Sequence, residues 1–220
     1  MSHTAGHPLL LAALVLVAGC GATTTPSAPV SDTHPTPAAA VPPVSAPAAV
    51  EAPIAAVETA VEPEKNPPGD MPDSQVFVAY TSPTDGVTLQ IPEGWARTEV
   101  PGGAQWIDKF DGVKVVAAPA NAAPTAATAA STLVPALQGS GHAVEIGAVS
   151  AVTLPGGSAV RIDYHANSEP NAVTDKKVRL EASNYYYFHD GKLLTLTVWA
   201  PAGADNVDQW DLMSKSLRWP

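Results

Sequence analysis

The 220-residue chain contains one cysteine, Cys20, which excludes an internal disulfide framework and any metal site built from several cysteines. It is also poor in basic residues, with 11 Lys plus Arg against 21 Asp plus Glu and a net charge of -10. A chain of this charge offers polyanions no electrostatic attraction, so nucleic acid is not expected as a partner. The Gly-x-Ser-x-Gly motif of serine hydrolases is missing as well.

Aromatic residues are scarce and unevenly placed along the chain. The five Trp, five Tyr and three Phe all follow Asp73. A hydrophobic core depends on such large side chains, so we expect a single domain in residues 74–220 and no folded domain before it.

The N-terminus has the pattern of a lipoprotein export signal. Leu9–Leu16 is a run of eight apolar residues, and Val17-Ala18-Gly19 leads directly into Cys20. Small residues before the cysteine fit the signal peptidase, and the thiol accepts a diacylglyceryl group as a thioether. We predict that residues 1–19 are a signal peptide, that cleavage falls between Gly19 and Cys20, and that Cys20 carries the lipid, with palmitate-type acyl chains.

Two features bear on this prediction. Pro8–Gly19 is shorter than the roughly 20 apolar residues that a membrane-spanning helix needs, which argues against an uncleaved anchor. No Lys or Arg precedes Leu9, unlike in most signal peptides, and a wrongly assigned start methionine would explain this. Two or three acyl chains, at about 0.8 kcal/mol per buried methylene, make a stable anchor. We therefore expect the domain on the exported side of the cell membrane.

Residues 20–73 have the composition of a tether. They are rich in Ala, Pro, Thr, Ser and Val, contain no aromatic residue, and show neither helical nor strand periodicity. We expect a disordered, extended linker that holds the following domain away from the membrane. O-glycosylation at Thr23–Thr25 and a proline-rich docking motif are the alternatives to a passive spacer.

Strand and turn patterns fill most of residues 74–220. Runs with alternating or β-branched apolar residues, separated by Pro, Gly and Asp-Gly turns, predict antiparallel hairpins. The predicted strand pairs are Val76–Thr81 with Val87–Ile91, Gln105–Phe110 with Val113–Ala117 around Asp111-Gly112, Ala143–Leu154 with Gly157–His165, and Lys177–Phe188 with Leu193–Trp199 around Asp190-Gly191.

Two helices are predicted beside these strands. Ala126–Gln138 has apolar residues at helical spacing. Pro135 lacks an N–H, so it either removes one backbone hydrogen bond of this helix or marks one of its ends. Gly139 is the predicted C-terminal cap. The second helix is expected to begin at Asp205 as its N-cap and to carry Trp210 on its apolar face.

The order of these elements resembles a known family. The strand exit Ile91-Pro92-x-Gly94-Trp95, the Ala-rich helix, the paired strands and the segment Pro201-x-Gly203-Ala204-Asp205 are similar to those of the actinobacterial LpqN/LpqT lipoproteins, over about Phe77–Trp219. The resemblance implies an α+β fold, a Mog1/PsbP-like α/β/α sandwich with a mainly antiparallel sheet. It also implies a non-catalytic role in envelope assembly, through a glycolipid or a partner protein. No residue pattern calls for a cofactor.

Aromatic side chains are the candidates for a ligand site. Each can fill the core, which is the default in a domain with few Phe and Ile, or can line an amphipathic groove. The five candidates are Trp95, Trp106, Tyr185, Tyr187 and Trp199.

Polar residues of the domain offer weaker candidates. Those that could ligate a metal are His142, His165, His189, Asp163, Asp190 and Glu169, and none has the spacing of a zinc motif, so no metal is expected. The alternative to a binding domain is a hydrolase of envelope lipids or sugars that uses Asp163, His165 or Glu181. The basic cluster Asp175-Lys176-Lys177 with Arg179 is interpreted as a solvated turn rather than a site for anionic headgroups.

Overall fold

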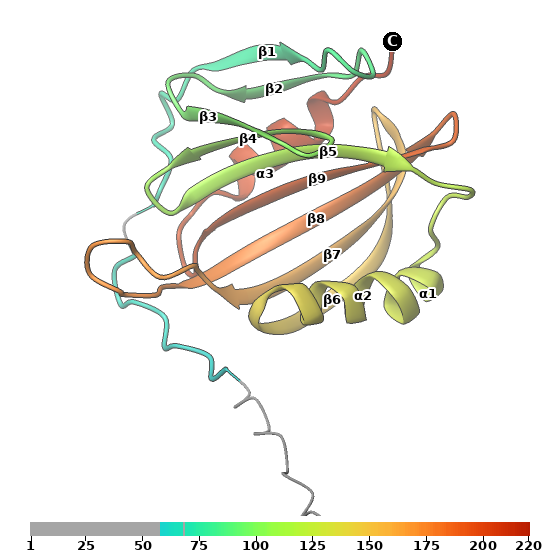
Figure 1. The fold of residues 1–220 in the computed structure, drawn as a ribbon. Helices are drawn as coiled ribbons and strands as arrows, with labels where there is room; N and C mark the ends of the chain where they lie inside the picture. Colours follow the sequence, from blue (N-terminus) through green and yellow to red (C-terminus); the bar gives the residue numbers. More distant parts are fainter. Residues whose placement is uncertain (1–57, 68) are drawn as a thin grey trace, which may run out of the picture. The chain divides into compact units, whose positions relative to one another are not determined.

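The computed structural model describes residues 58–67 and 69–220 (Figure 1). The predicted signal peptide, Cys20 and the first part of the predicted tether lie outside these residues. In the part of the chain that is described, no helix is long and apolar enough to cross a membrane.

An antiparallel sheet of seven strands is the centre of the described fold. Its strand order is β3-β4-β5-β9-β8-β7-β6, and a separate two-stranded sheet pairs β1 with β2. The strand bounds are β1 Phe77–Thr81, β2 Thr88–Pro92, β3 Ala96–Val100, β4 Gly103–Asp108, β5 Asp111–Pro119, β6 His142–Leu154, β7 Gly157–Asn167, β8 Arg179–His189 and β9 Lys192–Pro201. The predicted hairpins and the antiparallel pairing are confirmed, and β3 is a strand that the sequence did not indicate.

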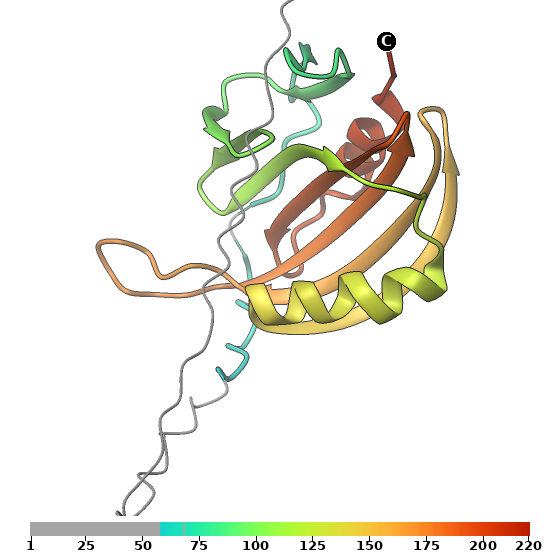
Figure 2. The ribbon, with the colours of Figure 1, turned by 45° about the vertical axis from the view of Figure 1, so that its right-hand side comes forward.

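Helices cover both faces of the large sheet, which confirms the α+β sandwich (Figures 1 and 2). Helix α3 (Val207–Ser216) places Trp210 and Met213 in the larger core, against the alternate residues Leu194, Leu196 and Val198 of β9. The opposite face carries a continuous helical segment made of α1 (Ala126–Thr128), a π-helical turn (Ala129–Leu133) and α2 (Val134–Ser140). This segment packs on β6, β7 and β8 and forms a second, smaller core.

The β4–β5 turn differs from the predicted one. Asp111 and Gly112 lie at the start of β5, and the two-residue turn consists of Lys109 and Phe110, with Lys109 at a φ of 54°. The Asp-Gly rule identified the hairpin but misplaced its turn by two residues. The reason lies across the sheet, since Gly112 is opposite Trp199 and leaves space for the indole there.

The first helical segment is longer than predicted. It ends at Ser140 with Gly141 as the C-cap, so Gly139 lies inside the helix rather than at its end. Pro135 does not break the segment. It follows the π-helical turn and occupies the first turn of α2, where a missing N–H is tolerated.

The last helix begins at Val207 with Asn206 as its N-cap residue, not Asp205 as predicted. The Asn206 side chain caps nothing within the helix. Its amide donates to the Gly69 carbonyl at 2.8 Å and to Asp111 at 3.1 Å, and its oxygen accepts the Met71 N–H at 2.7 Å. Asn206 therefore links the segment around Gly69 and Met71 to Asp111 of β5 at the start of α3.

The folded unit begins before the predicted boundary at about Asp73. Met71 is only 7% exposed and belongs to the larger core. Upstream of it, Thr59 and Val61 hydrogen-bond to Asn167 near the end of β7. Residues 58–67 and 69–73 thus contact the domain through single side chains and backbone groups, which leave no periodic signal in the sequence.

Candidate ligand groove

The site is built on the part of the sheet that α1 and α2 leave open. On β9, the residues Thr195, Thr197 and Trp199 point away from the larger core, because successive side chains of a strand alternate between faces. The helical segment packs near the β6 side of this face and contributes Leu137 to the groove wall. The central strands β8 and β9 therefore form the floor beside it.

This open face holds a groove of about 610 Å³, a volume in the range of small-molecule sites. One wall comes from β4 and β5, the floor from β8 and β9, and the other wall from α2 and the first residues of β6. The lining residues include Gln105, Ile107, Lys109, Phe110, Lys114, Leu137, His142, Val144, Tyr164, Ala166, Asn167, Glu169, Leu180, Ala182, Thr197 and Trp199.

Large apolar side chains in the groove are not used by either core. Ile107, Phe110, Leu180 and Trp199 are half-buried and line the groove, yet none of them packs in the core clusters of the described residues. Apolar surface left in a concavity and not used for folding is typical of a binding site.

Gly112 leaves room for the Trp199 indole over β5. A β-carbon on Gly112 would lie 1.8 Å from Cζ2 of the Trp199 indole, and the two residues are direct cross-strand partners. Only glycine therefore lets the indole lie over β5. The indole becomes a fixed aromatic surface in the groove, with an N–H that a polar ligand group can use.

The structure separates the five aromatic residues predicted from sequence. Trp106, Tyr185 and Tyr187 are 3%, 3% and 1% exposed and lie in the larger core, and Trp95 packs on its edge. The hydroxyl of Tyr187 donates to the Ser214 carbonyl of α3 at 3.0 Å. Trp199 is the one member of the five that lines the groove.

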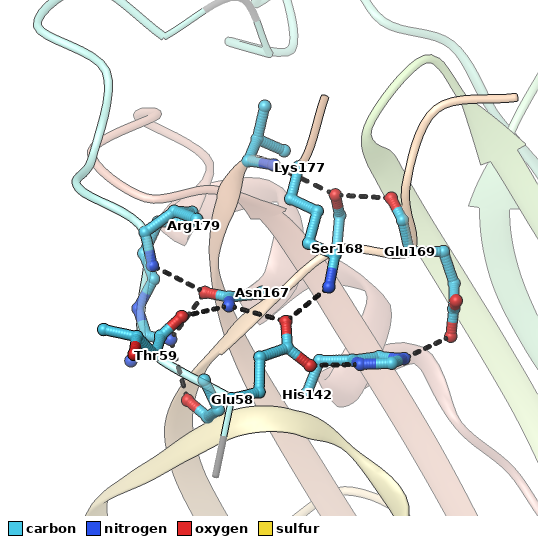
Figure 3. A network of polar contacts seen from close by, with 11 residues as sticks. Glu58, Thr59, His142, Asn167, Ser168, Glu169, Lys177 and Arg179 are labelled. Atoms are coloured by element: carbon cyan, nitrogen blue, oxygen red, sulfur yellow. Dashed lines mark hydrogen bonds and ion pairs between the residues drawn. The ribbon is translucent and has the colours of Figure 1, made fainter. Parts of the chain in front are cut away.

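A polar network lies at the end of the groove next to α2 (Figure 3). The Glu58 carboxylate accepts hydrogen bonds from Lys177 at 2.7 Å and from Asn167 at 2.9 Å, and it lies 2.6 Å from Nδ1 of His142. On the other side of the ring, Nε2 of His142 lies 2.9 Å from Glu169. The residues just before the domain thus contact the rim of the groove.

Charge pairing shifts the pKa of two members of this network. The pKa of Glu58 falls from 4.5 to about 2, because Asn167, Lys177 and His142 all donate to the carboxylate. The pKa of His142 is raised above 6.5 by Glu58 first and then by Glu169. A neutral imidazole has one N–H and cannot donate to both carboxylates, so the cationic ring is favoured here.

The contact between residues 58–61 and the rim should therefore depend on pH. The contribution of Glu58 is present above pH 4.5 and is lost as the pH falls towards 2, whereas that of His142 is complete below pH 6.5 and is lost as the pH rises through its raised pKa. We expect hydrogen-exchange protection of the Val61 amide, which donates to Asn167, to be highest between pH 4.5 and 6.5 and to drop about threefold once the pH has risen past the raised pKa of His142.

His142→Gln is the matched variant for this experiment. Glutamine keeps a donor but does not titrate, so the alkaline loss of protection should disappear while the acidic loss through Glu58 remains. Unchanged alkaline loss in the variant would assign the pH dependence to other groups.

A second, smaller hollow of about 210 Å³ lies on the opposite face beside α3. It is lined by Asp163, His165 and Glu181, the three residues of the hydrolase hypothesis, so the structure does bring them together. Asp163 accepts from Arg161 at 2.6 Å and from the Ser183 hydroxyl at 2.5 Å. Burial raises the pKa of Glu181.

The serine of this hollow is not an accessible nucleophile. Ser183, whose hydroxyl is bonded to Asp163, is only 1% exposed. A nucleophile must reach its substrate, so Ser183 is not placed to act as one; its hydroxyl and Arg161 both donate to Asp163.

The predicted metal candidates lie in separate pairs: His142 with Glu169, His189 with Asp190, and Asp163 with His165. Among residues 58–67 and 69–220, no group of three His, Cys, Asp or Glu side chains is arranged to hold a metal ion. His142 is engaged by two carboxylates, and His189 stacks on Trp219 with ring centroids 4.6 Å apart.

Comparison with known proteins gives structural neighbours only. No family model and no curated protein matches the sequence. The cyanobacterial PsbP protein CyanoP of Synechocystis matches with a TM-score of 0.47 at 18% identity, over 69% of this chain and 98% of that one. LpqN of Mycobacterium tuberculosis, which is involved in cell envelope biogenesis, matches with a TM-score of 0.40 at 15% identity, over 67% of this chain and 93% of that one. The chain is similar to these proteins, and membership of the LpqN/LpqT family stays a prediction.

Proposed function

We propose that this protein is a lipid-anchored, exported lipoprotein whose domain binds the apolar part of an envelope amphiphile, such as a glycolipid, in the groove on the open face of the sheet. The domain does so without catalysis, as a carrier or receptor in envelope assembly. Its predicted lipid on Cys20 would keep the groove close to membrane lipids and raise their effective concentration.

One observation carries the proposal. The groove combines half-buried apolar side chains that belong to neither core, namely Ile107, Phe110, Leu180 and Trp199, with polar side chains on its walls. An amphiphile has the same two parts, and an apolar chain removed from water gains about 25 cal/mol per Å² of buried surface. A groove of about 610 Å³ has room for part of such a chain.

Native mass spectrometry tests the proposal. The mature chain, residues 20–220 with Cys20→Ser to keep it free of lipid, is incubated with a detergent extract of its own cell envelope. We expect an acyl-bearing molecule to be released on activation. A protein without ligand, together with a crosslinked envelope protein in cells, would point to a protein-docking surface instead.

Two leucine variants make this test specific to the groove. Leu180→Gln places an amide in the groove, whereas Leu212→Gln alters an exposed residue of α3 on the other face. The first should lose the bound molecule and the second should keep it. Equal retention by both variants would place the ligand elsewhere.

The anchor is tested separately in cells. Cys20→Ala removes the thiol that accepts the lipid, so we expect the protein to carry no acyl chains and its signal peptide to remain uncut. The mass of the N-terminus reports both effects. Normal processing and membrane retention of this variant would show that the lipoprotein prediction is wrong.

A further inference from the structure

The groove contains one charged residue whose position is not explained by folding. Lys114 lies in the middle of β5, opposite Gln105 on β4 and Thr197 on β9, and its side chain lines the groove. It is half-buried in the described structure. A lysine in the centre of a sheet, facing a concavity, is an uncommon choice unless its charge is used.

Lys114 has no carboxylate partner among the described residues. Six of the eleven basic residues form ion pairs with Asp or Glu there, namely Arg97, Arg161, Lys176, Lys177, Arg179 and Lys215. Even Arg179, which is 4% exposed, lies 2.8 Å from Glu145. Lys114 is one of the five basic residues that form no such pair among the described residues, and it is the half-buried one of these that lines the groove.

The surroundings of Lys114 make its charge effective towards a ligand. Trp199 and Ile107 line the same groove, and a ligand bound between these apolar side chains would displace water, which strengthens the attraction between the ammonium group and an anion. Lys109, on the β4–β5 turn, adds a second, exposed positive charge to this wall. The carboxylate of Glu169 lies at the other end of the groove and is paired with His142.

We propose that the ligand of the groove is an anionic amphiphile, an acyl lipid whose phosphate or similar anionic headgroup contacts Lys114. This inference rests on the proposed function and specifies the class of amphiphile. The apolar chain would lie along Leu137 and Leu180, and the headgroup at the β5 wall beside the Trp199 indole. Lysine is a common phosphate ligand because its ammonium donates three hydrogen bonds from a compact charge.

Calorimetric titration with matched amphiphiles tests the proposal. Dodecyl phosphate and dodecyl maltoside carry the same chain and differ in headgroup charge, and both are added below their micelle concentrations to the mature chain with Cys20→Ser. We expect dodecyl phosphate to bind at least about tenfold tighter. Lys114→Gln should reduce its affinity to that of dodecyl maltoside, while Lys114→Arg should retain most of the difference.

Two controls accompany these variants. Lys192→Gln removes another half-buried lysine without an ion pair in the described residues, but one outside the groove, and should leave both affinities unchanged. Thermal unfolding of each variant tests whether the fold is retained, and we expect midpoints close to that of the unsubstituted protein. If Lys192→Gln weakened binding as much as Lys114→Gln, the effect would come from the net charge of the protein and not from Lys114, and the proposal would be overturned.

The remaining outcomes separate this inference from the proposed function. Equal binding of both amphiphiles, with no effect of Lys114→Gln, would contradict the inference of an anionic headgroup, while the proposal that the groove binds an amphiphile would stand. Binding of neither compound would contradict the proposed function itself. If inorganic phosphate alone bound as tightly as dodecyl phosphate, the ligand would be a free anion, and the acyl part of the inference would be wrong.

Discussion

Replacement of Asn206 by alanine should lower the free energy of unfolding by about 3 kcal/mol. Asn206 is 1% exposed, and its side chain bonds to Gly69, Met71 and Asp111. Alanine would leave the Met71 N–H without its partner, and a buried donor without a hydrogen bond costs about 1–3 kcal/mol. Urea unfolding at pH 6 measures the change.

The same variant should also free the start of the folded unit. Without the Asn206 side chain, the backbone of Gly69 and Met71 loses two hydrogen bonds, so we expect faster protease cleavage before Asp73. Asn184→Ala is the matched control, because Asn184 is also buried but donates to the hydroxyl of Tyr186 within the sheet. Similar cleavage of both variants would show that general destabilisation, and not the loss of this attachment, exposes the segment.

Asp111 makes the Asn206 site sensitive to pH. Burial first, and then the nearby charge of Asp108, raise the pKa of Asp111 to about 7. A carboxyl with a raised pKa stabilises the fold below the unfolded value of 3.8, and the effect is lost as the pH rises through 7. The unfolding measurements on Asn206→Ala therefore need a fixed pH, below 7, at which Asp111 is mostly protonated.

Gly112→Ala should lower the free energy of unfolding by about 2–3 kcal/mol and displace the Trp199 indole from the groove. The new methyl group would overlap the Trp199 indole at 1.8 Å, so the indole or the strand must move. We expect the fluorescence emission of Trp199 to shift in wavelength and the amphiphile to bind at least about tenfold more weakly, because the indole is displaced.

A double mutant identifies the cause of that cost. Adding Trp199→Ala removes the overlap, so the double mutant Gly112→Ala/Trp199→Ala should show no further loss from the methyl group at position 112. Gly139→Ala is the control for backbone entropy: it lies inside α2 with open space around it, and alanine there should stabilise by about 0.5–1 kcal/mol. Additive costs in the double mutant would contradict the packing explanation.

Local sequence rules predicted every strand except β3, because the other strands each carry their own signal. Alternation and turn residues identify the hairpins β6–β7 and β8–β9, and the turn at Asp190-Gly191 lies where it was predicted. The rule failed at Asp111-Gly112, where the glycine is needed for the approach of Trp199 from a strand 87 residues later. A glycine required by a distant neighbour and one required by a turn look the same in the sequence.

The groove illustrates a different limit. Strand alternation places Tyr185 and Tyr187 on one face and Ala182 on the other, but it does not say which face a helix covers. Only the packing of α3 over the two tyrosines and the position of α2 beside Ala182 decide this. Lys114 was overlooked because one lysine in a strand is ordinary until its neighbours are known.

No sequence pattern indicated that residues 58–67 and 69–73 contact the domain. Glu58, Thr59 and Val61 bind the rim through a carboxylate and backbone groups, which have no period and no apolar pattern. The low complexity of residues 20–73 predicted a tether, and the folded unit takes up its last part.

The position of the ligand is the central claim, and Trp199 reports it directly. In an NMR titration of the mature chain with Cys20→Ser, each tryptophan gives its own indole N–H resonance, and dodecyl phosphate is added below its micelle concentration. We predict that the Trp199 signal shifts, while Trp106 and Trp210, which lie in the core on the other face, stay in place. A Trp199 signal that remains unchanged while the amphiphile binds would contradict the groove as its site.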